Sequence, residues 1–146
     1  MDDYEKYVED RKTKRDANKR LLSNFKTWLK SSGLSKKTID NHLSNIDFYL
    51  NKYLLYQDNT NEKKYGVDAV DMFLGYWFIK KAMWSTQSSI KNNAASFKKF
   101  YTFMYEKGLI DKDDLADLKK TIKEGMPEWL TTLKRYDDPS VEDIWL

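Results

Sequence analysis

The sequence predicts an all-α protein, and three observations support this fold class. Proline and glycine are rare, two and five in 146 residues, which favours long helices over strands and tight turns. Apolar residues recur at steps of three and four along several long segments, as one buried face of a helix requires. These segments begin after Ser, Thr or Asp and end near glycine, as helices commonly do. We therefore expect five or six helical segments packed as a bundle.

The first helix is expected over about residues 3–31, with Gly33 as its stop. Its first half is almost entirely polar and basic, so it is expected as a solvated extension or a frayed arm. Its second half carries one apolar face, made up of Leu21, Leu22, Phe25, Trp28 and Leu29.

The second helix is expected from an N-cap at Ser35 to about Tyr53. His42 lies one position before the apolar stripe, so we expect an ordinary boundary residue rather than a ligand or a general base. Residues 57–66 are polar and aperiodic, and are expected as a loop. The stripe follows alternating steps of four and three through Ile39, Leu43, Ile46, Leu50 and Tyr53.

The third helix, over about residues 67–83, is the most apolar and is expected at the centre of the bundle. Ser85 or Thr86 is expected to open a fourth helix that runs to Lys107 and is closed by Gly108. The third helix is expected to bury Val70, Phe73, Leu74, Trp77 and Phe78. The fourth is expected to bury Ile90, Ala94, Phe97, Phe100, Tyr101, Phe103 and Met104.

Two further helices are expected near the C-terminus. Asp111 is the expected cap of a fifth helix through Lys123, and Pro127 suits the first turn of a short sixth helix. The tail beyond Pro139 has no clear assignment. The apolar residues expected to pack are Leu115, Leu118 and Ile122 in the fifth helix, and Trp129, Leu130 and Leu133 in the sixth.

Composition removes most enzyme classes. The chain has no cysteine and a single histidine, so thiolate sites, disulfides and multi-histidine metal sites are excluded, and a Ser/His/Asp triad is not expected. The glycines are scattered, so no phosphate-cradling loop is expected. We expect no catalytic residues, no metal and no cofactor. No apolar run reaches transmembrane length and no signal-peptide pattern follows Met1, so we expect a cytoplasmic protein with no membrane partner.

Charge is distributed unevenly along the chain. Residues 1–10 carry five acids and one lysine, residues 11–110 carry nineteen basic against eight acidic residues, and residues 111–146 carry ten acids against six bases. A basic middle between acidic ends is compatible with a polyanion-binding surface. The alternative is that the lysines only solvate helix faces.

Two helix openings are candidate anion-binding sites. One is Ser35-Lys36-Lys37-Thr38 with Asn41 one turn later, and the other is residues 85–89 followed by Lys91, Asn92 and Asn93. Free backbone N–H groups and the helix dipole favour a phosphate at such a position, and these side chains also contact phosphates and base edges. The alternative at each opening is that Ser and Thr only cap the helix.

Two stretches resemble the core-binding, SAM-like N-terminal domain of phage-integrase-type tyrosine recombinases. The first is residues 35–43 (SKKTIDNHL), continuing to Ile46 and Phe48. The second is residues 89–104 (SIKNNAASFKKFYTFM), followed by residues 106–110 (EKGLI). The first helix, with Trp28 and Leu29 before Gly33, also fits this family. The resemblance covers about residues 21–110, and its motifs are degenerate.

The resemblance implies an orthogonal bundle of four core helices, with one or two C-terminal helices added. It divides the chain into a polar N-terminal extension (1–20), a core-binding-like bundle (21–110) and a C-terminal extension with an acidic tail (111–146). It further implies a clamp lobe lying across double-stranded DNA, with the second and fourth helices facing the major groove. The DNA contacts carried over in this way are Lys36, Lys37, Thr38, Asn41, Thr86, Gln87, Ser89, Lys91, Asn92, Lys98 and Lys99.

The chain departs from the family pattern after Ile110. No Asn-Pro exit and no arginine-, histidine- and tyrosine-bearing catalytic domain follows, so strand cleavage is not expected. The leading hypothesis is a non-catalytic DNA-binding domain related to site-specific recombination and integration. The main alternative is a protein-interaction or regulatory module whose acidic segment with Trp129 and Trp145 binds a recombinase, another protein, or this chain's own basic face. A weaker third class is an enzyme fragment that needs a partner to complete its site.

Overall fold

A computed structural model of the chain describes residues 2–56, 67–81 and 85–137. The regular structure within these ranges is helical, with no strand, which confirms the all-α fold class. Contacts group the chain into two compact units, Met1–Thr60 and Asn61–Leu146. The boundaries expected after residues 20 and 110 rest on polarity and on the resemblance, and they stay predictions.

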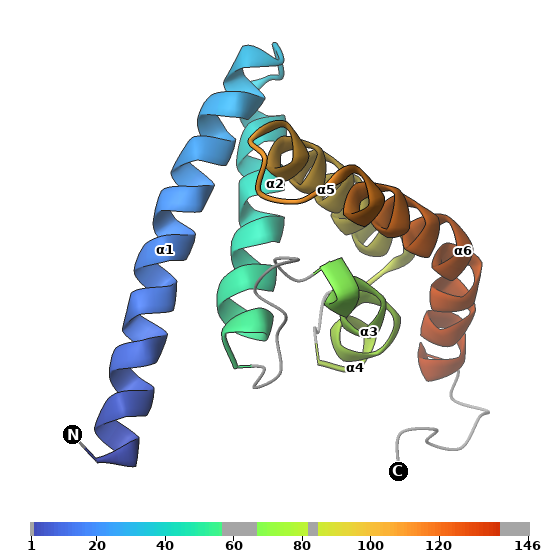
Figure 1. The fold of residues 1–146 in the computed structure, drawn as a ribbon. Coiled ribbons are helices and arrows are strands. Elements are labelled where there is room, and N and C mark those ends of the chain that lie inside the picture. The colour runs from blue at the N-terminus through green and yellow to red at the C-terminus, as the bar shows by residue number, and fades with distance from the viewer. Residues whose placement is uncertain (1, 57–66, 82–84, 138–146) are drawn as a thin grey trace. The chain divides into compact units, whose positions relative to one another are not determined.

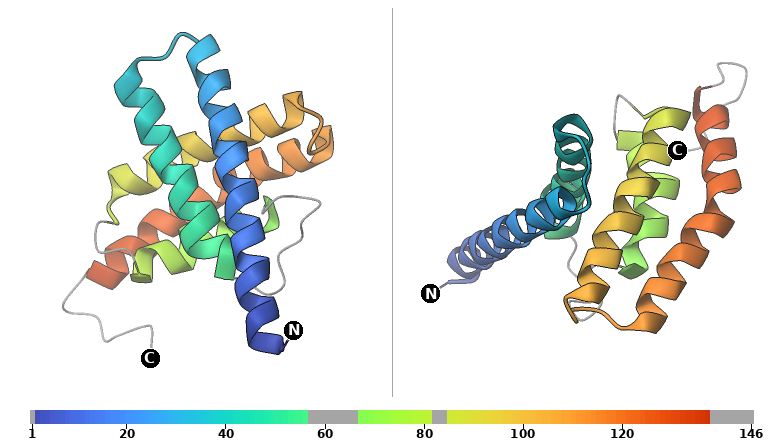
Figure 2. Two further views of the ribbon diagram at one scale, coloured as in Figure 1. Left: turned by 90° about the vertical axis from the view of Figure 1, so that its left-hand side faces the viewer. Right: turned by 90° about the horizontal axis from the view of Figure 1, so that it is seen from above.

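The first unit begins with α1 (Asp3–Ser31), whose bounds match the prediction. The Asp2 carboxylate accepts a hydrogen bond from the Glu5 amide at 2.7 Å, which satisfies one free N–H of the first turn. The polar first half is therefore a continuous part of the helix. Gly33 ends this segment with a φ of 76°, a left-handed conformation that costs glycine little. The chain then reverses into an antiparallel second helix (Figure 2).

The second helix α2 (Lys36–Phe48) begins at the predicted cap, because the Ser35 side chain accepts a hydrogen bond from the Thr38 amide. It continues through η1 (Tyr49–Tyr53), a π-helical turn, and η2 (Leu54–Tyr56), a 3-10 turn. The expectation for His42 was wrong, since His42 is 5 % exposed whereas Leu43 is half-buried. The predicted stripe is otherwise confirmed, since Ile39, Ile46, Leu50 and Tyr53 are buried; His42 and Tyr49 are buried beside them. The loop expected over residues 57–66 lies outside the described residues.

The second unit begins with the most apolar segment of the chain. Its parts are η4 (Val67–Ala69), α3 (Val70–Met72), η5 (Phe73–Trp77) and α4 (Phe78–Lys81). The predicted helix is thus helical as far as Lys81, while residues 82–84 are not described. Because η5 is π-helical, burial steps by five residues, from Phe73 to Phe78 and from Leu74 to Ile79, and Trp77 is only half-buried.

The helix α5 (Gln87–Glu106) begins at Thr86 with a reciprocal capping box. The Ser89 amide donates to Thr86 Oγ1 at 3.0 Å, and the Thr86 amide donates to Ser89 Oγ at 2.6 Å. The seven apolar side chains predicted for this helix are all buried. Gly108, with a φ of 75°, follows its end as expected.

The helix α6 (Lys112–Asp137) is one continuous element, so the expected break into two helices was wrong. Asp111 begins it as predicted, and Asp111 and Asp114 each accept a hydrogen bond from the other's amide. Pro127 lies inside the helix, which bends along its length (Figure 1). The helix packs on α5 and on each part of the η4–α4 segment.

The core of the second unit is aromatic. Phe73 meets Phe97 edge-on, with ring centroids 5.9 Å apart, and α5 runs antiparallel to α6 (Figure 2). Trp129 of α6 is 3 % exposed, and its indole N–H donates to Asp71 Oδ1 at 2.9 Å. A Cβ added at Gly75 would lie 2.6 Å from Trp129 Cδ1, and one added at Gly125 would also clash with the indole. Two glycines on neighbouring elements therefore provide the space for this side chain.

Candidate nucleic-acid interface

The fourth predicted helix places three of the predicted contacts on one exposed face. Gln87, Lys91 and Lys98 are exposed and lie within roughly 40° of one another around α5, opposite the buried aromatic side. This face is polar and positively charged because the apolar residues of α5 are committed to the core. Backbone N–H groups of the first turn and two lysines are available there to an anion.

The other predicted contacts on α5 are either half-buried or already engaged in capping the helix. Asn92 and Lys99 are half-buried at the flank of the helix. The hydroxyls of Thr86 and Ser89 are engaged in the capping box, and Ser89 Oγ also donates to the Thr86 carbonyl at 2.9 Å. Capping thus accounts for the hydroxyl side chains at this helix start, and their contact with DNA stays a prediction.

The start of α2 exposes Lys36, Lys37 and Asn41, while Thr38 is half-buried. Ser35 Oγ donates to Thr38 Oγ1 at 3.0 Å, so both hydroxyls take part in capping here too. A shallow open depression on this helix is lined by Lys37, Thr38, Asp40, Asn41 and Ser44.

The charge of α2 is balanced, unlike that of α5. Its two lysines, Lys36 and Lys37, are matched by the exposed Asp40 and Asp47. Asp40 lines the same depression as Lys37, and a carboxylate there opposes a phosphate. In contrast, α5 carries three lysines and one glutamate. The predicted contacts on α2 and α5 fall in different units.

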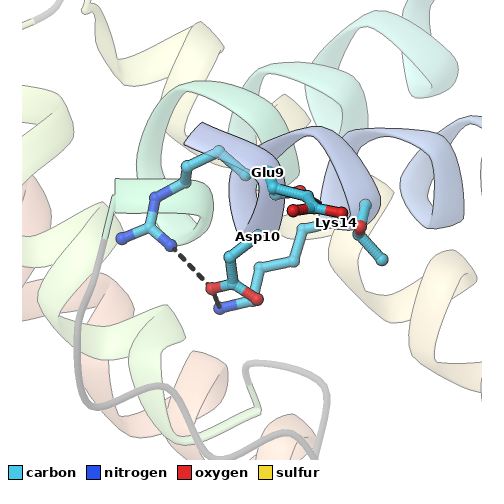
Figure 3. Close-up of polar contacts among 5 residues, drawn as sticks. Glu9, Asp10 and Lys14 are labelled. Atoms are coloured by element: carbon cyan, nitrogen blue, oxygen red, sulfur yellow. Dashed lines mark hydrogen bonds and ion pairs between the residues drawn. The ribbon is translucent and has the colours of Figure 1, made fainter. Parts of the chain in front are cut away.

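The first helix holds basic residues that were not included among the predicted contacts. Near its acidic start, Asp10 Oδ2 lies 3.3 Å from the Arg11 guanidinium and 3.5 Å from Lys14 Nζ (Figure 3). Arg11 is buried with its guanidinium 4.3 Å from the centroid of the Tyr7 ring, and Arg15 donates to the Tyr56 hydroxyl at 2.9 Å. Several lysines beyond these residues are exposed. A seven-residue spacing of lysines is the sequence signal that could have identified them.

The alternative hypothesis, a protein-interaction module that uses the C-terminal segment, relied on two tryptophans, Trp129 and Trp145. Only that alternative used Trp129 to contact a partner. Trp129 is buried between Gly75 and Gly125, as the packing expectation had it, and its N–H is hydrogen-bonded to Asp71. It is therefore part of the core. The acidic segment from Val141 to Leu146, including Trp145, lies outside the described residues.

Metal-binding clusters and membrane-spanning helices are both absent from residues 2–56, 67–81 and 85–137. No three His, Cys, Asp or Glu side chains there are grouped so that they could hold a metal ion. None of the helices in those ranges combines the length and the apolar character needed to cross a membrane.

Comparison of the chain with protein-family models, with curated proteins and with solved structures gave no significant match.

Proposed function

We propose that the chain is a non-catalytic DNA-binding protein that holds double-stranded DNA mainly through phosphate contacts. The observation that carries this proposal is the exposed face of α5, where Gln87, Lys91 and Lys98 lie opposite a fully packed aromatic core. Lysines and amides are the side chains that contact DNA phosphates most often. The resemblance of residues 21–110 to recombinase core-binding domains adds a role in site-specific recombination or integration, with a recombinase as the protein partner.

The test is binding of a fluorescent mixed-sequence duplex, followed by anisotropy over a salt series. The logarithm of the binding constant is expected to fall linearly with the logarithm of salt, by about 0.9 for each phosphate neutralised. The double variant K91E/K98E is expected to lower that slope by about 2, because two phosphate contacts are lost. The double variant K36E/K37E tests the start of α2 in the same way.

The matched control is K119E/K120E on α6, which reverses two exposed lysines outside the predicted contacts and changes net charge equally. It is expected to keep the wild-type slope. If wild-type protein shows no binding at low salt, or if the control weakens binding as much as K91E/K98E, the proposal is wrong.

A further inference from the structure

A densely basic surface lies on α1. From Lys12 to Lys30 there are seven basic residues and one acid, Asp16. Two of the basic residues at the start of α1, Arg11 and Lys14, are partly neutralised by Asp10, and Arg15 bonds the Tyr56 hydroxyl. The remaining positive charge is therefore concentrated further along the helix.

Four of these lysines form a single exposed row, which we call the α1 lysine stripe: Lys12, Lys19, Lys26 and Lys30. Seven residues are close to two helical turns, so the four positions fall within about 40° of one another around the axis. At about 1.5 Å per residue, the stripe is about 27 Å long. None of the four lysines forms an ion pair within the described part of the chain.

The helix is held by its packed side, and the stripe lies on the flank, about 60–140° around the axis from Phe25 and Leu29. Phe25 and Leu29 are fully buried, and α1 packs on α2 along that side. Asn18 donates to Asn51 at 2.9 Å, a second link between α1 and the η1 turn. A straight, anchored helix presents its lysines in a fixed row, and the ordering of the backbone that positions them has already taken place before any ligand binds.

We propose that the α1 lysine stripe is a DNA-binding surface that follows the phosphate backbone of a duplex over about eight base pairs, at about 3.4 Å per step. The proposal rests on the proposed function and adds to it a surface that lies outside the α2 and α5 contacts. The charge complementarity between four unpaired lysines and a phosphate row is the basis for the choice of partner.

The residues around the stripe disfavour two other polyanionic partners. Asp16, Ser23 and Thr27 lie on one side of the row. On the other side Leu22 is half-buried and Val8, one turn before Lys12, is exposed, so the apolar surface beside the lysines is small for insertion into a lipid surface. Single-stranded nucleic acid is usually held by stacking on exposed aromatic rings. The two aromatic residues in this part of α1 are Phe25, which is buried, and Trp28, which is half-buried and stacked on Phe25. A duplex, recognised by its backbone, is the partner that these residues fit.

The experiment compares two quadruple variants with equal net charge in the same anisotropy assay. K12Q/K19Q/K26Q/K30Q removes the stripe, and K112Q/K119Q/K120Q/K123Q removes four exposed lysines of α6. Glutamine has a helix propensity close to that of lysine, so both proteins are expected to stay folded, as circular dichroism will show. The stripe variant is expected to lower the salt slope by about 3 to 4, since each lost phosphate contact removes about 0.9. The α6 variant is expected to keep the wild-type slope.

If the quadruple variant unfolds, the double variants K12Q/K19Q and K26Q/K30Q replace it in the assay. Each double variant is expected to lower the salt slope by about 2. An unchanged slope in folded stripe variants, or an equal loss in the α6 variant, overturns the stripe while leaving the α5 face intact. If the salt slope falls in the stripe variant but not in K91E/K98E, the result supports DNA contact by the stripe and contradicts DNA contact by the α5 face. Absence of any duplex binding by wild-type protein overturns both. Binding to vesicles containing anionic lipid, lost in the stripe variant while the DNA slope is unchanged, assigns the surface to a membrane instead.

Discussion

Trp129 shows how single residues determine the packing of the second unit. Its indole fills a space that exists only because Gly75 and Gly125 have no side chains, and its N–H is satisfied by Asp71. A buried indole N–H without a partner costs about 1–3 kcal/mol, so the aspartate matters as well as the glycines. The sequence shows the four residues but not their proximity, because Gly75 and Trp129 are 54 positions apart.

The substitution Gly125→Ala is expected to destabilise the protein by about 1–3 kcal/mol, as overpacking of a core does. The sign is diagnostic, because alanine in place of glycine in a helix normally stabilises by up to about 1 kcal/mol. Urea unfolding gives the free energies. In a Trp129→Ala background the clash is absent, so Gly125→Ala is expected to become neutral or stabilising there. If Gly125→Ala destabilises both backgrounds equally, the indole is not the cause.

Tyr53 gives the stability a dependence on alkaline pH. Burial raises the pKa of its hydroxyl above the ordinary value of 10.0. Above about pH 10 the unfolded chain therefore loses this proton while the folded chain keeps it, and the free energy of unfolding falls as pH rises. The contribution is fully present below pH 10 and is lost as pH rises through the raised pKa.

Urea unfolding of Tyr53→Phe from pH 8 to pH 11 tests this expectation. Relative to wild type, the variant is expected to gain stability progressively above about pH 10, because it has no proton to lose. Tyr4→Phe, at a position that is 74 % exposed, is the matched control for removal of a tyrosine hydroxyl. Parallel curves for wild type and Tyr53→Phe over the whole range would show that burial of Tyr53 has no such effect.

At the scale of elements, helix starts were the best predicted features. Ser35, Thr86 and Asp111 each cap the helix that the sequence assigned to them, because a cap is a local interaction between neighbours. The end of α1 was also predicted, since Gly33 acts through its own backbone conformation. His42 was misplaced because its burial depends on which side of α2 faces α1, and tertiary packing decides that.

Pro127 is the element-scale feature that local rules misread. Proline commonly begins a helix, yet here α6 continues through it, and the Lys123 carbonyl receives no hydrogen bond from an amide at position 127. Pro127→Ala is expected to raise the free energy of unfolding by about 1–3 kcal/mol, since it restores that donor and removes a ring clash. Urea unfolding measures the change.

Glu128→Ala is the control for this substitution, because Glu128 is the adjacent exposed residue of the same helix and is expected to change stability by less than about 0.5 kcal/mol. A less stable Pro127→Ala protein would mean that the bend in α6 is required to seat Trp129 over Gly125.

At the scale of the whole molecule, the distribution of charge matters more than its sum. A net charge of +3 is small, but acids dominate the two ends of the sequence, and the segment from Lys12 to Lys30 has a balance of +6. Composition could therefore indicate a polyanion partner without locating the surface. The candidate contacts were chosen from helix starts in a resembling family, whereas recognising the exposed basic row on α1 depends on knowing which side of α1 is packed.

The all-helical class was predictable because periodicity, caps and the scarcity of glycine and proline agree with one another. The division into two compact units was not, since contacts between distant segments define it. The π-helical turns were not predictable either, because a hydrophobic period of 3.6 residues does not indicate where such a turn occurs.

The wide turn at Phe73–Trp77 also affects how related sequences should be aligned with this one. A π-helical turn closes its hydrogen bond over five residues instead of four, so it holds about one residue more than the α-helical turn it replaces. A descendant of the same ancestor without this turn would have one residue fewer there. An ungapped alignment would then pair every later position with its neighbour, and core residues such as Ile90 would be compared with surface residues such as Lys91.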